Sequence, residues 1–248
     1  MPSEYILSTS RSDLDFYYRK GIRMKEKRKI RGAIFDMDGT LVDSLVIWDF
    51  FWQAIGDRYF DGTPYKPDEF TEKEMRTHVL ADSMRIFHEN TGVGESAEEI
   101  LALGREVFAR FYREEVELKA GAYEFLEYLA SRGVKMCVAS ATTPDQVEVV
   151  LRRCGIDKFM EGIVSCTDTG IGKEEPDVFI RAHKFLGTPK DETWVFEDSI
   201  VAVDSATRAD FNTVGIYDKY GFELERLCEL STVYLDADMT YHDLIDIF

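Results

Sequence analysis

The chain of 248 residues is long enough to bury a substantial core and to form one large domain or one domain that carries an insert. With 45% hydrophobic residues, 31% charged residues and only 6 prolines, its composition excludes a disordered or fibrous protein. The formal net charge of -17 repels nucleic acid and anionic membrane surfaces, so we expect neither as a partner. A small phosphorylated molecule can bind only where local positive charges overcome this field.

The N-terminal residues 1–29 are polar, end in a run of mixed charge and are expected to form an extension before the first strand. No stretch reaches the roughly 18 apolar residues of a membrane-spanning helix and no apolar signal core is present, which favours a cytoplasmic protein. The cysteines lack CxxC spacing, and we expect buried free thiols at Cys137, Cys154, Cys166 and Cys228. The histidines show no metal-ligand spacing, so a zinc hydrolase is not expected.

Short apolar runs alternate with helical patterns through most of the chain, which is typical of βα units that build a parallel sheet. Five runs are short and hydrophobic on both faces, as buried central strands require. These predicted strands cover residues 30–35, 134–139, 163–166, 194–196 and 213–216. Amphipathic helices between them are predicted over residues 122–130, 144–153 and 176–186, with proline or glycine near their ends.

Residues 45–118 break this alternation, because they show helical periodicity and no convincing strand. We therefore expect a helical insert. Its aromatic residues form a stripe that favours packing in a core over a ligand platform. The stripe consists of Trp48, Phe51, Trp52, Phe108, Phe111 and Tyr112.

The first predicted strand ends in Asp36-Met37-Asp38-Gly39-Thr40, at the carboxyl edge where open α/β sheets bind their ligands. In extended backbone, Asp36 and Asp38 point to the same face, about 6.6 Å apart along the chain. A plain turn is the alternative for so short a motif. A calcium loop of the EF-hand type is not, because it needs glutamate at the twelfth position, where Ile47 stands.

Three more polar segments follow predicted strands or precede a predicted helix, in a fixed order along the chain. They are Ser140-Ala141-Thr142, Gly172-Lys173-Glu174-Glu175 and Glu197-Asp198-Ser199. With the DxDGT motif, they supply two carboxylates, a hydroxyl, an ammonium group and a further acidic pair. This set resembles the haloacid dehalogenase superfamily, specifically its phosphatase and phosphoglucomutase-like branch. The resemblance covers residues 30–217, and DxDGT is its most specific element.

The resemblance implies an α/β fold with a Rossmann-like, three-layer parallel-sheet core and an inserted all-helical cap domain. The catalytic core would then comprise residues 30–44 and 119–248, and the cap domain residues 45–118. It further implies a Mg²⁺-dependent phosphatase that hydrolyses a small phosphorylated metabolite through an aspartyl-phosphate intermediate. A sugar phosphomutase is the alternative. A catalytically silent binding protein of the same fold is disfavoured, because all of the motif residues are present.

Carried over to this chain, the resemblance makes Asp36 the nucleophile and Asp38 the acid/base residue. Ser140 and Ala141 would bind the phosphoryl group, and Lys173 would neutralise its charge. The remaining implied roles concern the metal. Mg²⁺ would be held by the Asp36 carboxylate, the Asp38 backbone carbonyl and Asp198, with Glu197 supporting from outside the metal ligands.

Electrostatics independently requires such cations. Two like charges 4 Å apart repel by about 4 kcal/mol at an effective dielectric constant of 20, and a phosphate beside several carboxylates multiplies this repulsion. Mg²⁺ typically binds through one or two carboxylates and phosphate oxygens, so this metal together with Lys173 would reverse the local sign of the charge.

The chain departs from the family pattern at three positions. Glu174 follows Lys173 where proline is usual, which adds a negative charge, and Ala202 and Asp210 stand where glycine is common. Asp tolerates the left-handed conformation better than most residues, so Asp210 is compatible with it. Basic residues of the insert that could contact substrate are more readily explained as solvated helix charges. They are Lys66, Lys73, Arg76 and Arg85.

Overall fold

The computed structural model describes residues 27–248, so most of the extension expected at residues 1–29 lies outside the described residues. Six parallel strands form one sheet in the order β3-β2-β1-β4-β5-β6. They are β1 (Gly32–Phe35), β2 (Lys135–Ser140), β3 (Ile163–Ser165), β4 (Thr193–Glu197), β5 (Asn212–Ile216) and β6 (Val233–Leu235). The first five match the predicted strands to within two residues at each end. The prediction missed β6, because a run of three residues carries too little pattern.

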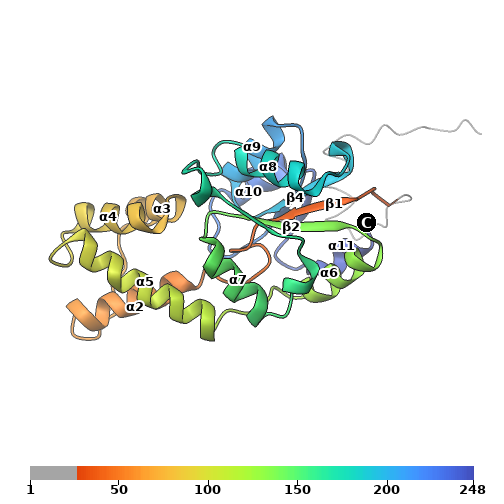
Figure 1. Cartoon of the computed structure of the whole chain (residues 1–248). Helices are drawn as coiled ribbons and strands as arrows, with labels where there is room; N and C mark the ends of the chain where they lie inside the picture. The colour runs from red at the N-terminus through yellow and green to blue at the C-terminus, as the bar shows by residue number, and fades with distance from the viewer. Residues whose placement is uncertain (1–26) are drawn as a thin grey trace, which may run out of the picture.

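Helices cover both faces of the sheet and produce the three-layer α/β core that the sequence predicted (Figure 1). One layer consists of α6 (Ala122–Ser131), α7 (Pro144–Arg153) and α11 (Tyr241–Ile245). The opposite layer consists of α8 (Asp177–Leu186), α9 (Ile200–Arg208) and α10 (Leu224–Leu230).

Side chains of the central strand β1 alternate between these two layers. Phe35 belongs to the apolar cluster that contains Phe125 of α6, and its ring stacks on Phe196 of β4 at a centroid distance of 4.3 Å. Ile34 belongs to the other cluster, with Phe179 of α8. Burial on both faces holds β1 in a fixed orientation, and this orientation determines how the residues after Phe35 leave the sheet.

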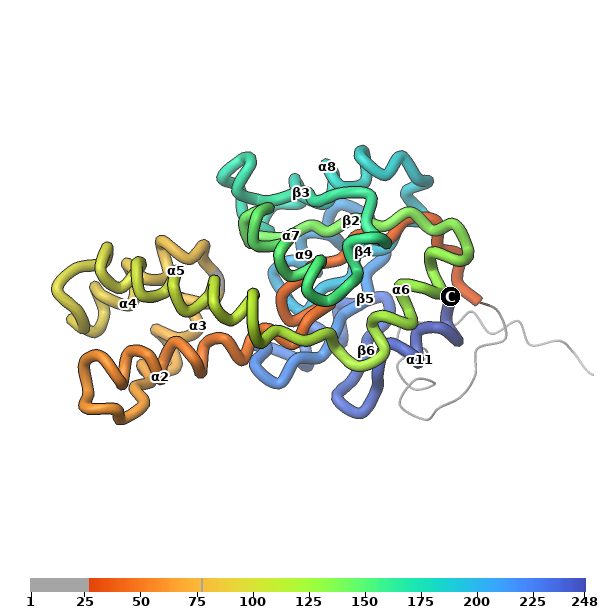
Figure 2. The backbone as a smooth tube through the Cα atoms, turned by 60° about the horizontal axis from the view of Figure 1, so that its bottom comes forward, coloured from red at the N-terminus to blue at the C-terminus, as the bar shows by residue number. Residues whose placement is uncertain are grey.

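The insert between β1 and α6 folds into helices that lie to one side of the sheet (Figures 1 and 2). They are α2 (Ile47–Tyr59), α3 (Glu69–Thr77), α4 (Leu80–Thr91) and α5 (Ala97–Glu114). Side-chain caps explain two of the starts, because Asp68 accepts a hydrogen bond from Thr71 N before α3 and Ser96 accepts one from Glu99 N before α5. No strand lies between α2 and α5, as expected for an all-helical cap.

Aromatic residues form the interior of this cap. Trp48 meets Phe108 edge-on at a centroid distance of 5.4 Å, and Phe51 meets Phe87 at 6.0 Å. Such pairs stabilise the cap beyond their burial alone. The prediction that the aromatic stripe serves core packing is confirmed for Trp48, Phe51 and Phe108, whereas Tyr112 has an additional contact that is described below.

Two chain segments join the cap to the sheet, and they run side by side. Val42 and Leu118 form an isolated antiparallel bridge. Next to it, Asp43 N donates to Glu117 O at 2.9 Å, and Lys119 N donates to Leu41 O at 2.9 Å. The bases of α2 and α5 are therefore connected where they leave the core.

The four cysteines are free thiols, as predicted; Cys154 is half-buried and the other three are buried. Burial raises the pKa of the Cys137 thiol to about 12, with a small further contribution from Glu161. Among the described helices, none combines the length and apolar character needed to cross a membrane.

Candidate active site

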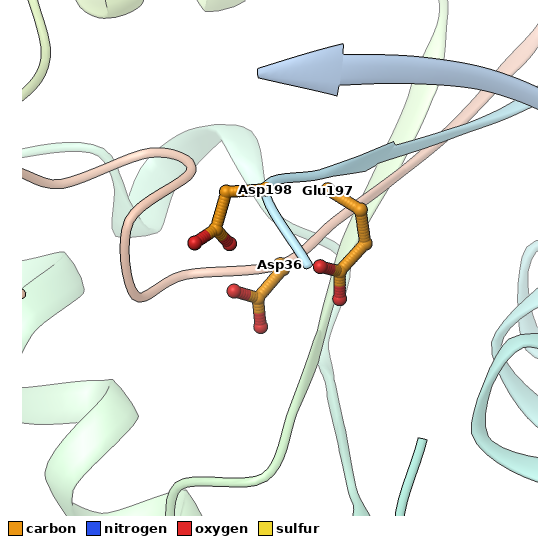
Figure 3. Close-up of side chains that lie close together, drawn as sticks. All are labelled: Asp36, Glu197 and Asp198. Carbon is orange, nitrogen blue, oxygen red and sulfur yellow. The ribbon is translucent and has the colours of Figure 1, made fainter. Parts of the chain in front are cut away.

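Acidic side chains converge at the carboxyl edge of the sheet, where β1 and β4 lie side by side and the strand order reverses. The pairing of Phe35 with Phe196 places the next residues, Asp36 and Glu197, beside each other, and Asp36 N donates to Phe196 O at 2.9 Å. Asp198 follows directly. Each of these three carboxylates has an oxygen within 4.8 Å of the others (Figure 3).

Lys173 reaches this cluster from the loop before α8. Its Nζ contacts both Asp36 Oδ1 and Glu197 Oε1. The loop is anchored from α9, where Ser205 Oγ donates to the Lys173 carbonyl oxygen at 2.6 Å. Burial opposes the charged form of Lys173, but the carboxylates of Asp36 and Glu197 outweigh this effect and raise its pKa. Lys173 is therefore a buried ammonium group.

One lysine cannot neutralise three buried carboxylates. Burial raises the pKa of Asp36 well above its usual value, with Lys173 opposing and Glu197 adding to the shift. Burial, reinforced by Glu197, likewise raises the pKa of Asp198 to about 8. In their ionised forms, the three carboxylates would carry more negative charge than Lys173 balances, which is the condition that suits a divalent cation.

The available oxygens also fit a cation. Glu197 uses Oε1 for Lys173 and accepts a hydrogen bond from Ser199 N at Oε2, at 3.1 Å. Asp36 and Asp198 each use only one carboxylate oxygen in contacts within the described residues, Asp36 with Lys173 and Asp198 with Thr40 Oγ1 at 3.0 Å. The second oxygens of Asp36 and Asp198 could therefore hold a metal ion.

Gly39 permits this arrangement. Its φ of +73° lies in the left-handed region, and a Cβ atom at this position would lie 2.4 Å from Asp198 Oδ2. The motif glycine is thus required both for the turn after Asp38 and for the close approach of Asp198.

Asp38 lies two residues beyond Asp36 but has different neighbours. Its Oδ1 accepts hydrogen bonds from Ser44 Oγ at 2.7 Å and from Tyr112 OH at 2.8 Å. Its Oδ2 accepts one from Thr142 Oγ1 at 2.7 Å. Its hydrogen-bond partners among the described side chains are therefore neutral hydroxyl groups.

The loop after β2 brings Ser140 and Ala141 to the same edge. Ser140 is buried and its Oγ accepts from Thr142 N at 3.0 Å, while Ala141 is exposed. Ser165 Oγ, at the end of β3, donates to the Thr142 carbonyl oxygen at 3.0 Å and fixes the loop. All of the site residues expected from the sequence therefore lie at or beside the carboxyl edge.

The sequence interpretation assigned no role to the hydroxyl groups that contact Asp38 and Asp198. Thr142 is part of the Ser140-Ala141-Thr142 segment, and the sequence predicted only a packing role for Tyr112. For Tyr112 the available signal was its phenol group, since a buried tyrosine hydroxyl usually finds a hydrogen-bond partner. No local signal marked Thr40 or Ser44 beyond their place after the DxD pair.

The basic cap residues considered as substrate contacts are all engaged in ion pairs. Lys66 pairs with Glu72 at 3.1 Å, Lys73 with Glu223 at 2.9 Å and Arg85 with Glu89 at 2.9 Å. The expectation of a solvated charge is wrong for Arg76, whose side chain is only 8% exposed. Its guanidinium group contacts Glu72, donates to the Tyr220 carbonyl oxygen at 3.2 Å and lies near the rings of Trp48, Tyr220 and Phe222.

The departures from the family pattern are accommodated. Asp210 has a φ of +58° and so adopts the left-handed conformation with which an aspartate is compatible. The Glu174 side chain is exposed, and its carbonyl oxygen accepts a hydrogen bond from Arg208 Nη2 at 2.6 Å. Ala202 is fully buried under the sheet.

Curated proteins of known name are similar to most of the chain. It is 24% identical to a phosphorylated carbohydrates phosphatase of Thermotoga maritima, covering 75% of this chain and 84% of that protein. It is 25% identical to the β-phosphoglucomutase of Mycobacterium bovis, with 75% and 80% covered. It is 27% identical to the validoxylamine A 7'-phosphate phosphatase of Streptomyces hygroscopicus, with 87% and 94% covered.

Solved structures share the fold. CbbY of Rhodobacter sphaeroides, in complex with phosphate, superposes with a TM-score of 0.63 at 20% identity, over 78% of this chain and 89% of that one. The β-phosphoglucomutase of Clostridium difficile superposes with a TM-score of 0.63 at 16% identity, over 84% and 91%. The sequence model of the haloacid dehalogenase-like hydrolases matches residues 30–210. The chain is therefore an enzyme of the haloacid dehalogenase-like hydrolase family, to which its motifs pointed.

Proposed function

We propose that the chain is a Mg²⁺-dependent phosphatase that hydrolyses a small phosphorylated metabolite through an aspartyl-phosphate on Asp36. The observation that carries this proposal is the contrast at the sheet edge. Asp36 lies with Lys173 in a charged, buried cluster, whereas Asp38 is surrounded by hydroxyl groups. This contrast supports a role as nucleophile for Asp36 and a role as proton carrier for Asp38.

The reaction has two steps. In the first, an Asp36 oxygen attacks phosphorus while Asp38 gives a proton to the leaving oxygen. In the second, Asp38 takes a proton from water as the water oxygen attacks the same phosphorus, and Asp36 is released as a carboxylate. Asp38 ends the cycle protonated and ready for the next substrate.

The phosphoryl group needs donors and positive charge around it. Lys173 supplies the charge, and Ser140 with the backbone at Ala141 supplies hydrogen bonds at the end of β2. Lys173 is suited to this role because its ammonium group already contacts Asp36, the residue that must approach phosphorus. Its burial strengthens this electrostatic contribution.

Mg²⁺ would be held by the carboxylates of Asp36 and Asp198 and by the Asp38 backbone carbonyl. Glu197, whose two oxygens already contact Lys173 and Ser199 N, would support these ligands from outside. When bound, a divalent cation in such a site polarises phosphoryl oxygens and offsets the charge of the carboxylates.

The names of relatives suggest the class of substrate. Two of the similar proteins are phosphatases of phosphorylated carbohydrates and of validoxylamine 7'-phosphate, both small molecules. The net charge of -17 also disfavours polyanionic substrates. We place the enzyme in the cytoplasm, where small phosphorylated metabolites are abundant. A sugar phosphomutase is the second candidate, because another relative is a β-phosphoglucomutase.

A panel of small phosphomonoesters tests the proposal, with phosphate release measured in Mg²⁺ and in excess chelator. We expect release that requires Mg²⁺ and that falls to background in Asp36→Asn. Equal release by Asp36→Asn and by the wild type would show that Asp36 is not the nucleophile. Interconversion of sugar-phosphate isomers without net phosphate release, stimulated by a bisphosphate, would identify a phosphomutase instead.

A further inference from the structure

The hydroxyl groups that donate to Asp38 come from both parts of the molecule. Ser44 and Thr142 belong to segments that follow β1 and β2, whereas Tyr112 lies near the end of the cap helix α5. Tyr112 is 4% exposed, and its ring packs against Phe111 at a centroid distance of 6.0 Å. The phenol therefore has little freedom to move independently of α5.

The two oxygens of Asp38 are not equivalent. Oδ1 accepts from both Ser44 at 2.7 Å and Tyr112 at 2.8 Å, whereas Oδ2 accepts only from Thr142 at 2.7 Å among the described residues. A carboxylate oxygen has about two acceptor sites, so Oδ1 is saturated and Oδ2 keeps one site. Burial, reinforced by Asp38, raises the pKa of the Tyr112 phenol well above its usual value, so Tyr112 remains a donor.

We propose that Tyr112 is a positioning residue supplied by the cap, which saturates Oδ1 together with Ser44 and leaves Oδ2 as the proton-transfer atom of Asp38. This inference rests on the proposed phosphatase function. In the first step the proton on Oδ2 passes to the leaving oxygen as the bond from that oxygen to phosphorus breaks. In the second step Oδ2 takes a proton from water, as the water oxygen bonds to phosphorus and the bond from phosphorus to Asp36 breaks.

The position of the cap then controls the acid/base residue. Tyr112 lies just before the segment in which Glu117 and Lys119 hydrogen-bond to the chain that leaves β1. A rotation of α5 about this connection would move the phenol away from Asp38 while Ser44 and Thr142 stayed with the core. Asp38 is fully oriented only when the cap lies as it does here.

Tyr112→Phe removes the hydroxyl group and keeps the ring. We use two substrates, p-nitrophenyl phosphate and the alkyl phosphate that the wild type hydrolyses fastest in the panel. For the alkyl phosphate, whose leaving oxygen needs a proton, kcat/KM should fall about tenfold or more. For p-nitrophenyl phosphate, whose leaving group departs unprotonated, kcat/KM should change by less than about twofold. Tyr65→Phe, which removes a different cap hydroxyl, should leave both values unchanged.

Equal losses for both substrates, or no loss for either, would overturn the positioning role of Tyr112. Ser44→Ala gives a second route, because it removes the other donor to Oδ1 and should produce the same dependence on the leaving group. The thermal midpoint of each variant is measured to confirm that it folds. An inactive wild type would remove the proposed function, whereas an active wild type with a normal Tyr112→Phe variant would remove only this inference.

Discussion

Asp36 and Asp38 leave the same strand two residues apart, yet the regions around them differ. Asp36 lies in the core among charged groups, with Lys173, Glu197 and Asp198 as neighbours. Asp38 lies between core and cap, and its hydrogen-bond partners are hydroxyl groups from both. Neighbouring residues of one short motif thus acquire different chemistry from the elements that surround them.

The difference matches what the two proposed roles require. A nucleophilic carboxylate must remain ionised and must approach a phosphate, which demands nearby positive charge. A proton carrier must change its charge twice in each cycle, and neutral donors allow this without breaking a buried ion pair. The charged region consists of Asp36, Lys173, Glu197 and Asp198, and the hydroxyl region consists of the three hydroxyl groups that donate to Asp38. The two regions can therefore be tested separately.

The largest expected effects come from replacing Asp36 or Asp38. They are compared in a rapid-mixing experiment that follows the release of p-nitrophenol from p-nitrophenyl phosphate. Asp36→Asn should give no burst of p-nitrophenol and a loss of kcat on the order of 10⁶, as when a covalent nucleophile is removed. Asp38→Asn should give a burst equal to the enzyme concentration, because this leaving group needs no proton. Turnover after the burst should be slower by about 10²- to 10⁴-fold, because water attack lacks its base.

A burst of p-nitrophenol in Asp36→Asn would show that another residue is the nucleophile, and would remove the proposed contrast between Asp36 and Asp38. Loss of the burst in Asp38→Asn would mean that Asp38 is needed to bind or align the phosphate, and that its surroundings do not confine it to proton transfer.

The charged region is tested next through stability. Lys173→Met leaves the carboxylates of Asp36 and Glu197 buried without their counter-charge, so the free energy of unfolding in metal-free buffer should fall by about 3 to 5 kcal/mol. Urea denaturation measures this change. Lys184→Met alters an exposed lysine of α8 and should change stability by less than about 0.5 kcal/mol. Similar stabilities of the two variants would show that Lys173 does not balance the cluster.

Mg²⁺ binding should depend on pH because the carboxylates of Asp36, Glu197 and Asp198 lie close together. The pKa of Asp198 is raised to about 8, so below that pH the metal-free carboxyl group holds a proton that Mg²⁺ must displace. The apparent dissociation constant for Mg²⁺ should therefore decrease by about tenfold per pH unit as the pH rises toward about 8, as measured by titration calorimetry. Asp198→Asn should abolish binding, and Asp204→Asn, which changes a half-buried residue of α9 outside the acidic cluster, should not. A pH-independent affinity in the wild type would contradict the raised pKa.

The sequence was sufficient for the parts of the molecule that depend on local pattern. Buried strands produce apolar runs, so five strands and the polar residues after them could be placed, and Asp36, Lys173 and Asp198 do meet in space. The strand β6 has too few residues to produce a recognisable run. The charged region was therefore largely predictable.

The hydroxyl groups around Asp38 could not be predicted, because their arrangement depends on how the cap packs on the core. Tyr112 lies 74 residues from Asp38 along the chain, and no periodicity of α5 shows which of its aromatic residues reaches the sheet. Arg76 was misjudged for the same reason: the loop that contains Tyr220 covers it. Contacts between the cap and the core leave little trace in local sequence.

The smallest expected effect concerns Thr142, the core donor to Asp38 Oδ2. Thr142→Val keeps the shape of the side chain and removes one hydrogen bond, so kcat/KM for an alkyl phosphate should fall by about fivefold, the effect of one such bond. Thr142→Ser keeps the hydroxyl group and should stay within about twofold of the wild type. Equal losses in both variants would assign the effect to the lost packing of the methyl group. A loss confined to Thr142→Val would show that the hydroxyl groups from the core, as well as that from the cap, set the geometry of Asp38.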